Sequence, residues 1–158
     1  MRACPPAPPS PQPSPASSPP PDSPSAPRPP RPRSAALGEC PSGKLCLWFN
    51  SNYAGARSDL QITDGSLANE LFNDGPAGRN GWLVQVEDNA ASVANRTGGY
   101  VELYGRRNCQ LGDGFGDLQA GEEDNLADLG LKNKVSSVRI WVRSQNRDAC
   151  ANVNSGGY

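Results

Sequence analysis

Short stretches in which hydrophobic and polar residues alternate recur along residues 38–143. In residues 45–49, Leu45, Leu47 and Phe49 fall on one face of an extended chain. The same two-residue period returns in three later stretches, residues 82–86, 100–104 and 138–142. Each stretch is β-branched or aromatic in character and is bounded by Gly, Asn or Asp, as strands are. Turn signals separate the stretches, so the pattern predicts an all-β sandwich.

Two further local signals lie between these stretches. Residues 66–72 show the one helical pattern of the chain, with Ser66 as the N-cap of a helix of barely two turns. The pair Gly98-Gly99, just before the stretch that opens at Tyr100, predicts a tight turn.

Part of the chain repeats itself. Residues 47–53 (LWFNSNY) parallel residues 103–109 (LYGRRNC) at an offset of 56. Residues 89–93 (NAASV) parallel residues 134–138 (KVSSV) at an offset of 45. Two such units could pack their apolar faces together, so that each buries what the other exposes. The alternative is a chance similarity between two short strand pairs.

The ends of the chain differ in composition from its middle. Of the 17 prolines, 15 lie within residues 1–33, a stretch without Val, Ile, Leu, Phe, Trp or Tyr. Such a sequence has no side chains with which to form a core, so residues 1–36 are predicted to be disordered with polyproline II character. Residues 37–150 form the predicted folded domain, and residues 151–158 a flexible C-terminal tail.

Charge and composition exclude several functions. Residues 34–158 carry 11 basic and 15 acidic side chains, a net charge of −4, without the basic cluster that nucleic-acid binding needs. No apolar run reaches the 18 residues of a membrane-spanning helix, so we expect no membrane insertion. The chain has no histidine, which removes the commonest general base and zinc ligand and argues against an enzyme.

Four of the five cysteines lie in the predicted domain: Cys40, Cys46, Cys109 and Cys150. An even number in a small loop-rich domain suggests two disulfides and an extracellular protein. Four cysteines allow three pairings. Cys40 and Cys46 can close a short loop, which leaves Cys109 for Cys150, and the alternative is four reduced, buried thiols. Residues 1–33 contain no recognisable signal peptide, because an apolar region is missing.

Trp48, Tyr53 and Gly55 resemble the Greek-key motif of the βγ-crystallin family. That motif has an aromatic residue, four residues, a Tyr, one residue and a Gly, followed later by a Ser that closes the folded hairpin. Ser92-Val93 and Ser136-Ser137-Val138 match this later part of the motif in the two copies. The resemblance implies two Greek keys, at about residues 40–97 and 98–143. In the second copy, Tyr104 stands at the aromatic position, while Cys109 and Leu111 replace the Tyr and the Gly.

Residues 40–57 (CPSGKLCLWFNSNYAGAR), together with residues 94–97 (ANRT) and 103–105 (LYG), are similar to bacterial secreted inhibitors of the crystallin-like peptidase inhibitor family. The founding type of that family blocks metalloproteases. The resemblance implies a monomeric inhibitor of a secreted protease, with a reactive bond after a cysteine of the second half. The matching protease-contact loop is Arg107, Asn108, Cys109, Gln110 and Leu111, with Cys109–Gln110 as the reactive bond. A disulfide at Cys109 would keep this loop rigid.

Two alternative functions start from the same fold. Related domains bind Ca²⁺ through a short motif, here represented by Asp88 and Ser92 and again by Asn133 and Ser136. Other motif positions are Glu87, Ala91 and Lys132, so we expect weak calcium binding at most and no other cofactor. A structural or calcium-responsive module is therefore one alternative to inhibition, and a secreted toxin-like antimicrobial sandwich is the other.

Overall fold

The computed structural model of this protein describes residues 39–141 and Cys150. The chain divides into two units, Met1–Arg31 and Pro32–Tyr158, and all of the described residues belong to the second. The predicted Pro-rich segment 1–36, the tail 151–158 and Cys4 lie outside the described residues.

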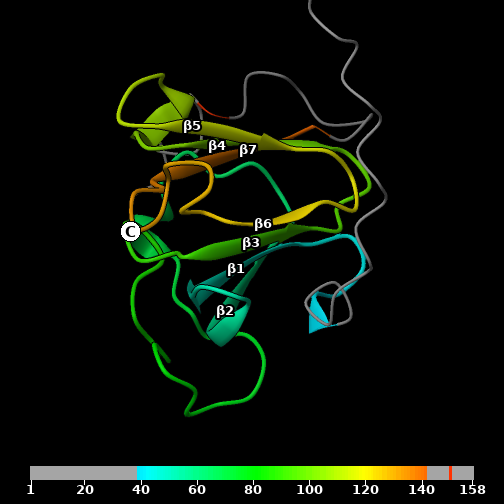
Figure 1. The fold of residues 1–158 in the computed structure, drawn as a ribbon, viewed down its shortest axis with the longest axis vertical. Helices are drawn as coiled ribbons and strands as arrows, with labels where there is room; N and C mark the ends of the chain where they lie inside the picture. The colour runs from blue at the N-terminus through cyan, green and yellow to red at the C-terminus, as the bar shows by residue number, and fades with distance from the viewer. Residues whose placement is uncertain (1–38, 142–149, 151–158) are drawn as a thin grey trace, which may run out of the picture. The chain divides into compact units, whose positions relative to one another are not determined.

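The described residues form seven strands in two antiparallel sheets, which lie as two layers in Figure 1. The first sheet has the order β2 (Ala54–Leu60), β1 (Leu45–Asn50), β3 (Ser92–Asn95), β6 (Glu123–Asn125). The second has the order β5 (Phe115–Leu118), β4 (Tyr100–Tyr104), β7 (Ser137–Trp141). The prediction of an all-β sandwich is confirmed. Within the part of the chain described, no helix is both long and apolar enough to cross a membrane.

One hydrophobic core lies between the two sheets. Leu45 and Leu47 from β1 meet Val101 and Leu103 from β4 in one cluster of fully buried side chains. Each such side chain stabilises the fold by roughly 1.5–3 kcal/mol relative to an exposed one. The opposite face of β1 is buried as well: its Cys46 and Trp48 pack in a second cluster with Cys40 and Ala94. Alternate residues of the stretch 45–49 therefore face two different buried clusters, one on each side of β1.

The two halves of the domain exchange short segments. Strand β6 comes from the second half and pairs with β3 in the first sheet. In return, Asp64 of the first half pairs with Val138 of β7 in the second sheet, through backbone hydrogen bonds of 3.0 and 2.9 Å. Each half thus completes the sheet of the other, which is why the repeated units form one domain.

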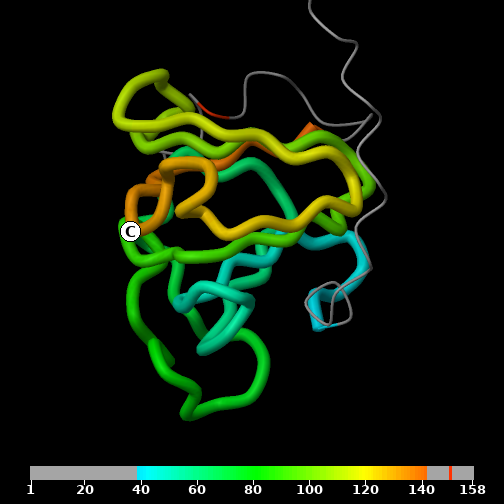
Figure 2. The backbone as a smooth tube through the Cα atoms, in the orientation of Figure 1, coloured from blue at the N-terminus to red at the C-terminus, as the bar shows by residue number. Residues whose placement is uncertain are grey.

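The predicted strand over residues 82–86 is wrong. Leu83 has a positive φ of 64° and Gly81 one of 86°, so the chain curls at this point instead of extending. Its backbone groups close a loop: Phe72 N–H donates to Val84 O (2.9 Å), and Leu83 N–H donates to Phe72 O (3.0 Å). The loop is the green segment at the bottom of Figure 2.

The predicted helix over residues 66–72 is reduced to the 3₁₀-helix η1 (Leu67–Asn69). Ser66 is extended, with φ −156°, and its side chain makes no capping hydrogen bond. The backbone groups bond elsewhere, because Leu67 N–H donates to Ser136 O (2.9 Å) and Val86 N–H donates to Glu70 O (2.9 Å). Long-range backbone pairing has overridden the local helical preference.

Candidate functional site

The folded hairpin of the first half is closed by a buried serine. Ser92 Oγ donates to Asn50 O (2.7 Å) and accepts the Tyr53 N–H (3.0 Å). The Tyr53 ring packs edge-on against Trp48, with ring centroids 5.6 Å apart. Gly55 has φ 82°, and a Cβ there would lie 2.8 Å from a backbone carbonyl oxygen, so only Gly fits.

The second half repeats this corner with different side chains. Ser137 Oγ donates to Arg106 O (2.5 Å) and accepts the Cys109 N–H (3.0 Å). Where the first half has a tyrosine ring, the second has the Cys109–Cys150 disulfide, and Cys150 is buried. The structure also pairs Cys40 with Cys46, so both disulfides follow the pairing that the spacing favours.

Residues 106–113 form the loop between β4 and β5, closed by a hydrogen bond of 3.0 Å from Gly105 N–H to Gly114 O. It is the yellow-green loop at the upper left of Figure 2. The loop opens with the 3₁₀-helix η2 (Arg107–Cys109), in which Asn108 and Cys109 have left-handed φ values of 58° and 51°. Asn108 N–H donates to Gly65 O (2.7 Å), which ties the loop to the first half.

Two ion pairs hold the loop further. Arg107 donates to both carboxylate oxygens of Glu87, at 2.7 and 2.6 Å, and Arg106 Nε lies 2.7 Å from Asp113 Oδ2. The Arg106 guanidinium lowers the pKa of the Asp113 carboxyl, and the bond to Glu87 raises the pKa of Arg107. The sequence indicated neither Glu87 nor Asp113 as a support for the loop, because these contacts arise only in the folded chain.

The structure places the predicted contact residues in one continuous surface segment. Arg107, Asn108, Gln110 and Leu111 are exposed, and Cys109 is half-buried. Gln110 is extended, with φ −84° and ψ 138°. The exposed dipeptide Gln110-Leu111 therefore follows directly after the residue that the disulfide and Ser137 hold in place.

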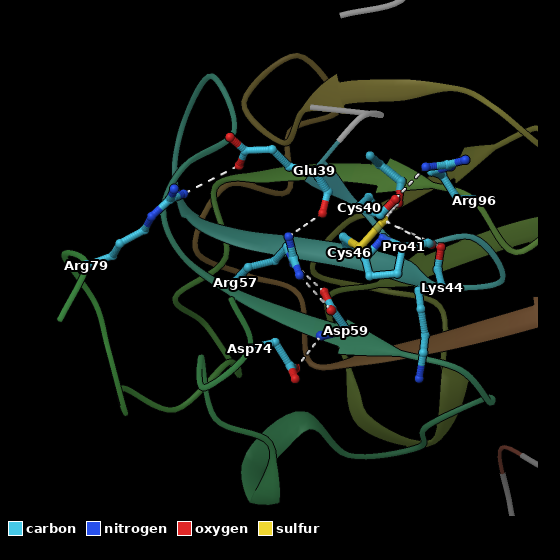
Figure 3. Close-up of polar contacts among 11 residues, drawn as sticks. Glu39, Cys40, Pro41, Lys44, Cys46, Arg57, Asp59, Asp74, Arg79 and Arg96 are labelled. Atoms are coloured by element: carbon cyan, nitrogen blue, oxygen red, sulfur yellow. Dashed lines mark hydrogen bonds and ion pairs between the residues drawn. A yellow bond between two sulfur atoms is a disulfide. The ribbon is translucent and has the colours of Figure 1, made fainter. Parts of the chain in front are cut away.

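The disulfide of the first half has a different environment, drawn in Figure 3. Cys40 and Cys46 are fully buried, and Arg96 Nη1 donates to Cys40 O (2.7 Å). Nearby, Arg57 pairs with Asp59 at 2.5 Å and donates to the Glu39 carbonyl oxygen. These contacts tie the start of the domain to β2, and the disulfide closes a short exposed turn at residues 41–43.

The residues of the two predicted calcium motifs do not form one pocket per motif, because a residue of each motif lines the same pocket. Asp88 and Ser136 line one pocket together with Gly105 and Lys134, and Ser136 Oγ lies 3.4 Å from Asp88 Oδ1. Ser92 does not take part, because its hydroxyl closes the first hairpin.

Asn133 lines both this pocket and a second one. In the second pocket, Ala91 occupies the motif position that Ser136 occupies in the first. Lys132 also lines this second pocket. The first pocket therefore combines two carboxylates, Asp88 and Asp113, with the Ser136 hydroxyl, which Ala91 replaces in the second. Among the described residues, no three His, Cys, Asp or Glu side chains gather into a group that could hold a metal ion.

Comparison with known proteins identifies the family of this chain. The model of peptidase inhibitor family I36 matches residues 33–116, which is more than half of the chain and includes the loop with Cys109. The chain belongs to peptidase inhibitor family I36. It is accordingly a non-enzymatic protein whose partner is a protease, and its two disulfides fit an extracellular I36 protein. No curated protein sequence matches the chain.

Solved structures show the fold of this I36 domain. A structure described as "Evolution of the eye lens beta-gamma-crystallin domain fold" is 16% identical, with a TM-score of 0.50, over 65% of this chain and 89% of that chain. A βγ-crystallin from Ciona intestinalis is 17% identical, with a TM-score of 0.48, over 63% and 100%. A βγ-crystallin domain from Flavobacterium johnsoniae is 23% identical, with a TM-score of 0.43, over 65% and 98%. The first of these likenesses establishes a βγ-crystallin fold and nothing further.

A pair of carboxyl groups lies in the I36 domain beside the segment that supports the loop. Asp64 and Glu70 are hydrogen-bonded through their side chains, and Asp64 Oδ1 also accepts the Ser66 N–H (2.8 Å). Burial raises the pKa of both groups, and the nearby charge of Asp64 raises that of Glu70 further. Gly65, whose carbonyl oxygen accepts the Asn108 N–H, lies between Asp64 and Ser66.

Proposed function

We propose that this protein is a secreted inhibitor that presents residues 107–111 to the active-site cleft of a secreted protease. The observation that carries the proposal is the Cys109–Cys150 disulfide at the start of an exposed segment whose first residue, Gln110, is extended. The loop belongs to the region matched by the I36 family model, which supports an inhibitory role for it.

The supports around the loop lower the cost of binding. Association loses about 0.5–1.5 kcal/mol for each flexible side chain that must be ordered. Here Arg107 is held by Glu87, Cys109 by its disulfide and Ser137, and Asn108 by the carbonyl of Gly65. Most of the loop is therefore ordered before a protease arrives.

The disulfide also limits the effect of cleavage. A cut after Cys109 would separate residues 1–109 from residues 110–158. Because Cys150 lies on the far side of the cut, the Cys109–Cys150 bond would still join the two fragments. A cleaved loop could then stay in the cleft, as a slowly released product.

The test is inhibition of a panel of secreted proteases by the full chain, with thermolysin-like metalloproteases first. We expect inhibition of at least one enzyme at micromolar concentration or below. A matched pair of variants separates the two disulfides: Cys109→Ser with Cys150→Ser should weaken inhibition strongly. Cys40→Ser with Cys46→Ser should weaken it less, because that disulfide lies away from the loop. A chain that inhibits no protease of the panel would refute the proposal.

The second candidate function is weak calcium binding, which we place at the pocket of Asp88 and Ser136. This pocket combines two carboxylates and a hydroxyl as oxygen ligands, but Lys134 adds a positive charge to it. Calorimetric titration with Ca²⁺ should show weak binding that Asp88→Asn abolishes. The matched variant Asp128→Asn, which removes an exposed carboxylate outside the pocket, should leave that binding unchanged, and binding unaffected by Asp88→Asn would contradict the assignment.

A further inference from the structure

We propose that Leu111 is the side chain that enters the specificity pocket of the protease, so that the partner is a protease with an apolar pocket. This inference rests on the proposed inhibitory function. It adds the residue that selects the target and the chemical character of the pocket that receives it.

Leu111 is the most exposed of the large hydrophobic side chains in the described residues. Its relative exposure is 72%, against 59% for Ile62 and 58% for Leu83. A single exposed leucine needs no explanation on its own. The position of Leu111, two residues from a fixed point on either side, is what distinguishes it.

These fixed points lie at Cys109 and Asp113. Cys109 is held by its disulfide and by Ser137. Asp113 precedes Gly114, whose carbonyl oxygen accepts the Gly105 N–H (3.0 Å), while the exposed Asp113 side chain pairs with Arg106. Gly112 permits this ion pair, because a Cβ at that position would lie 2.7 Å from Arg106 Cζ. The backbone is thus held on both sides of Leu111 while its side chain points away from any packing partner that would bury it.

Backbone conformation restricts which part of the loop can lie along a cleft. Peptides that add to the edge of a binding site do so as extended strands. Asn108 and Cys109 have left-handed φ values, and Gly112 has φ 122°. Between them, Gln110 is extended, with φ −84° and ψ 138°, and Leu111 has no positive φ, so left-handed residues lie only on either side of this dipeptide.

The two arginines of the loop are less suited to enter a pocket. Arg107 makes two hydrogen bonds with Glu87, whose side chain is 11% exposed, and Arg106 is paired with Asp113. A protease that selects arginine would have to break one of these pairs. Leu111 can enter an apolar pocket without such a loss, and its burial there would exclude water from its whole side chain.

The experiment measures inhibition constants for variants of the full chain against the protease that the unaltered protein inhibits best. Leu111→Ala should weaken inhibition about 10- to 100-fold, the effect of losing one buried leucine side chain. Ile62→Ala, which removes a comparably exposed apolar side chain outside the loop, should change it less than about twofold. Leu111→Asp should weaken inhibition at least as much as Leu111→Ala, because a carboxylate loses its hydration in an apolar pocket.

Because Leu111 is exposed, these variants should keep the melting temperature of the unaltered protein, which reports their folding. If the unaltered chain inhibits a protease and Leu111→Ala inhibits it equally well, the inference is overturned and the inhibitory function stands. If Gln110→Ala weakens inhibition more than Leu111→Ala does, the inference is overturned as well. If the unaltered chain inhibits no protease, both the proposed function and the inference are refuted.

Discussion

The folded hairpins of the two halves share the same backbone hydrogen bonds to a serine but differ in the side chains that complete them. In each, a buried serine bridges two backbone groups of the hairpin, Ser92 in the first half and Ser137 in the second. The first corner is completed by packing, since Tyr53 covers the buried Trp48 ring. The second is completed by a covalent bond, the Cys109–Cys150 disulfide. A disulfide needs no aromatic cover, which leaves the following residues free to be exposed.

This difference separates stability from recognition. The first corner buries Trp48 and Ser92 and contributes mainly to the fold. The second holds its backbone by a disulfide, a serine and two ion pairs, and exposes Gln110 and Leu111. The same β-hairpin framework therefore serves packing in one half and presentation of a loop in the other.

The largest predicted effect tests the packing of the first corner. Trp48→Ala removes a fully buried ring and its contact with Tyr53, and should lower the free energy of unfolding by about 3–5 kcal/mol. This is a large part of the total stability of a typical domain. Denaturant unfolding followed by circular dichroism would measure it, and a loss below about 1 kcal/mol would show that Trp48 is not a packing centre.

The next prediction compares the two disulfides. Cys109 and Cys150 are 41 residues apart, and Cys40 and Cys46 are 6 apart. From loop-closure entropy, removing the Cys109–Cys150 disulfide should lower the free energy of unfolding by about 4 kcal/mol, and removing Cys40–Cys46 should lower it by about 2 kcal/mol. Unfolding of the two double Cys→Ser variants gives both values. An equal loss would mean that strain or residual structure, rather than loop length, decides the difference.

Replacing the two bridging serines, Ser92 and Ser137, should have a smaller effect on stability and should affect inhibition differently. Ser92→Ala and Ser137→Ala each remove a buried hydroxyl and leave a backbone donor without its acceptor, at a cost of about 1–3 kcal/mol each. Inhibition should respond differently, because only Ser137 supports Cys109. Inhibition constants measured at a temperature where both variants are folded should rise for Ser137→Ala and stay near the original value for Ser92→Ala.

The smallest predicted effect concerns pH and the Asp64–Glu70 pair, which lies beside the loop support. Burial, Asp64 and Asp74 raise the pKa of Glu70 above its ordinary value of 4.5. The folded state therefore holds a proton that the unfolded state releases. The stability from this group is full below pH 4.5 and is lost as the pH rises through the raised value.

Glu70→Gln keeps the neutral donor at every pH. The variant should match the original protein in melting temperature below pH 4.5 and exceed it increasingly toward neutral pH. Thermal melts across that range measure the difference between the two proteins. A constant difference at all pH values would show that Glu70 does not hold the proton.

Alternation of residue type located three strands that carry the core, but it missed β2 and β5, although Leu60 and Leu118 of those strands also belong to the core. Strands β1, β4 and β7 fall on predicted stretches, apart from Val142, which lies outside the described residues. Strand β6 (Glu123–Asn125) has no hydrophobic residue, so alternation could not predict it. It is a strand because its backbone pairs with the neighbouring strand β3. The stretch at residues 82–86 has the strand pattern and is a loop, because it pairs with residues 70–72 only through an isolated bridge and Leu83 curls the chain.

The loop at Cys109 could be located in the sequence through its resemblance to the crystallin-like peptidase inhibitor family, which places the reactive bond after a cysteine of the second half. Its supports could not. Glu87, Gly65 and Asp113 reach the loop through contacts that form only when the halves exchange segments or the hairpin closes. Side-chain identity along the chain decides which segments extend and which cysteines can pair. The exposure of Leu111 and the rigidity of its flanks depend on distances across the fold, so they became visible only in the tertiary structure.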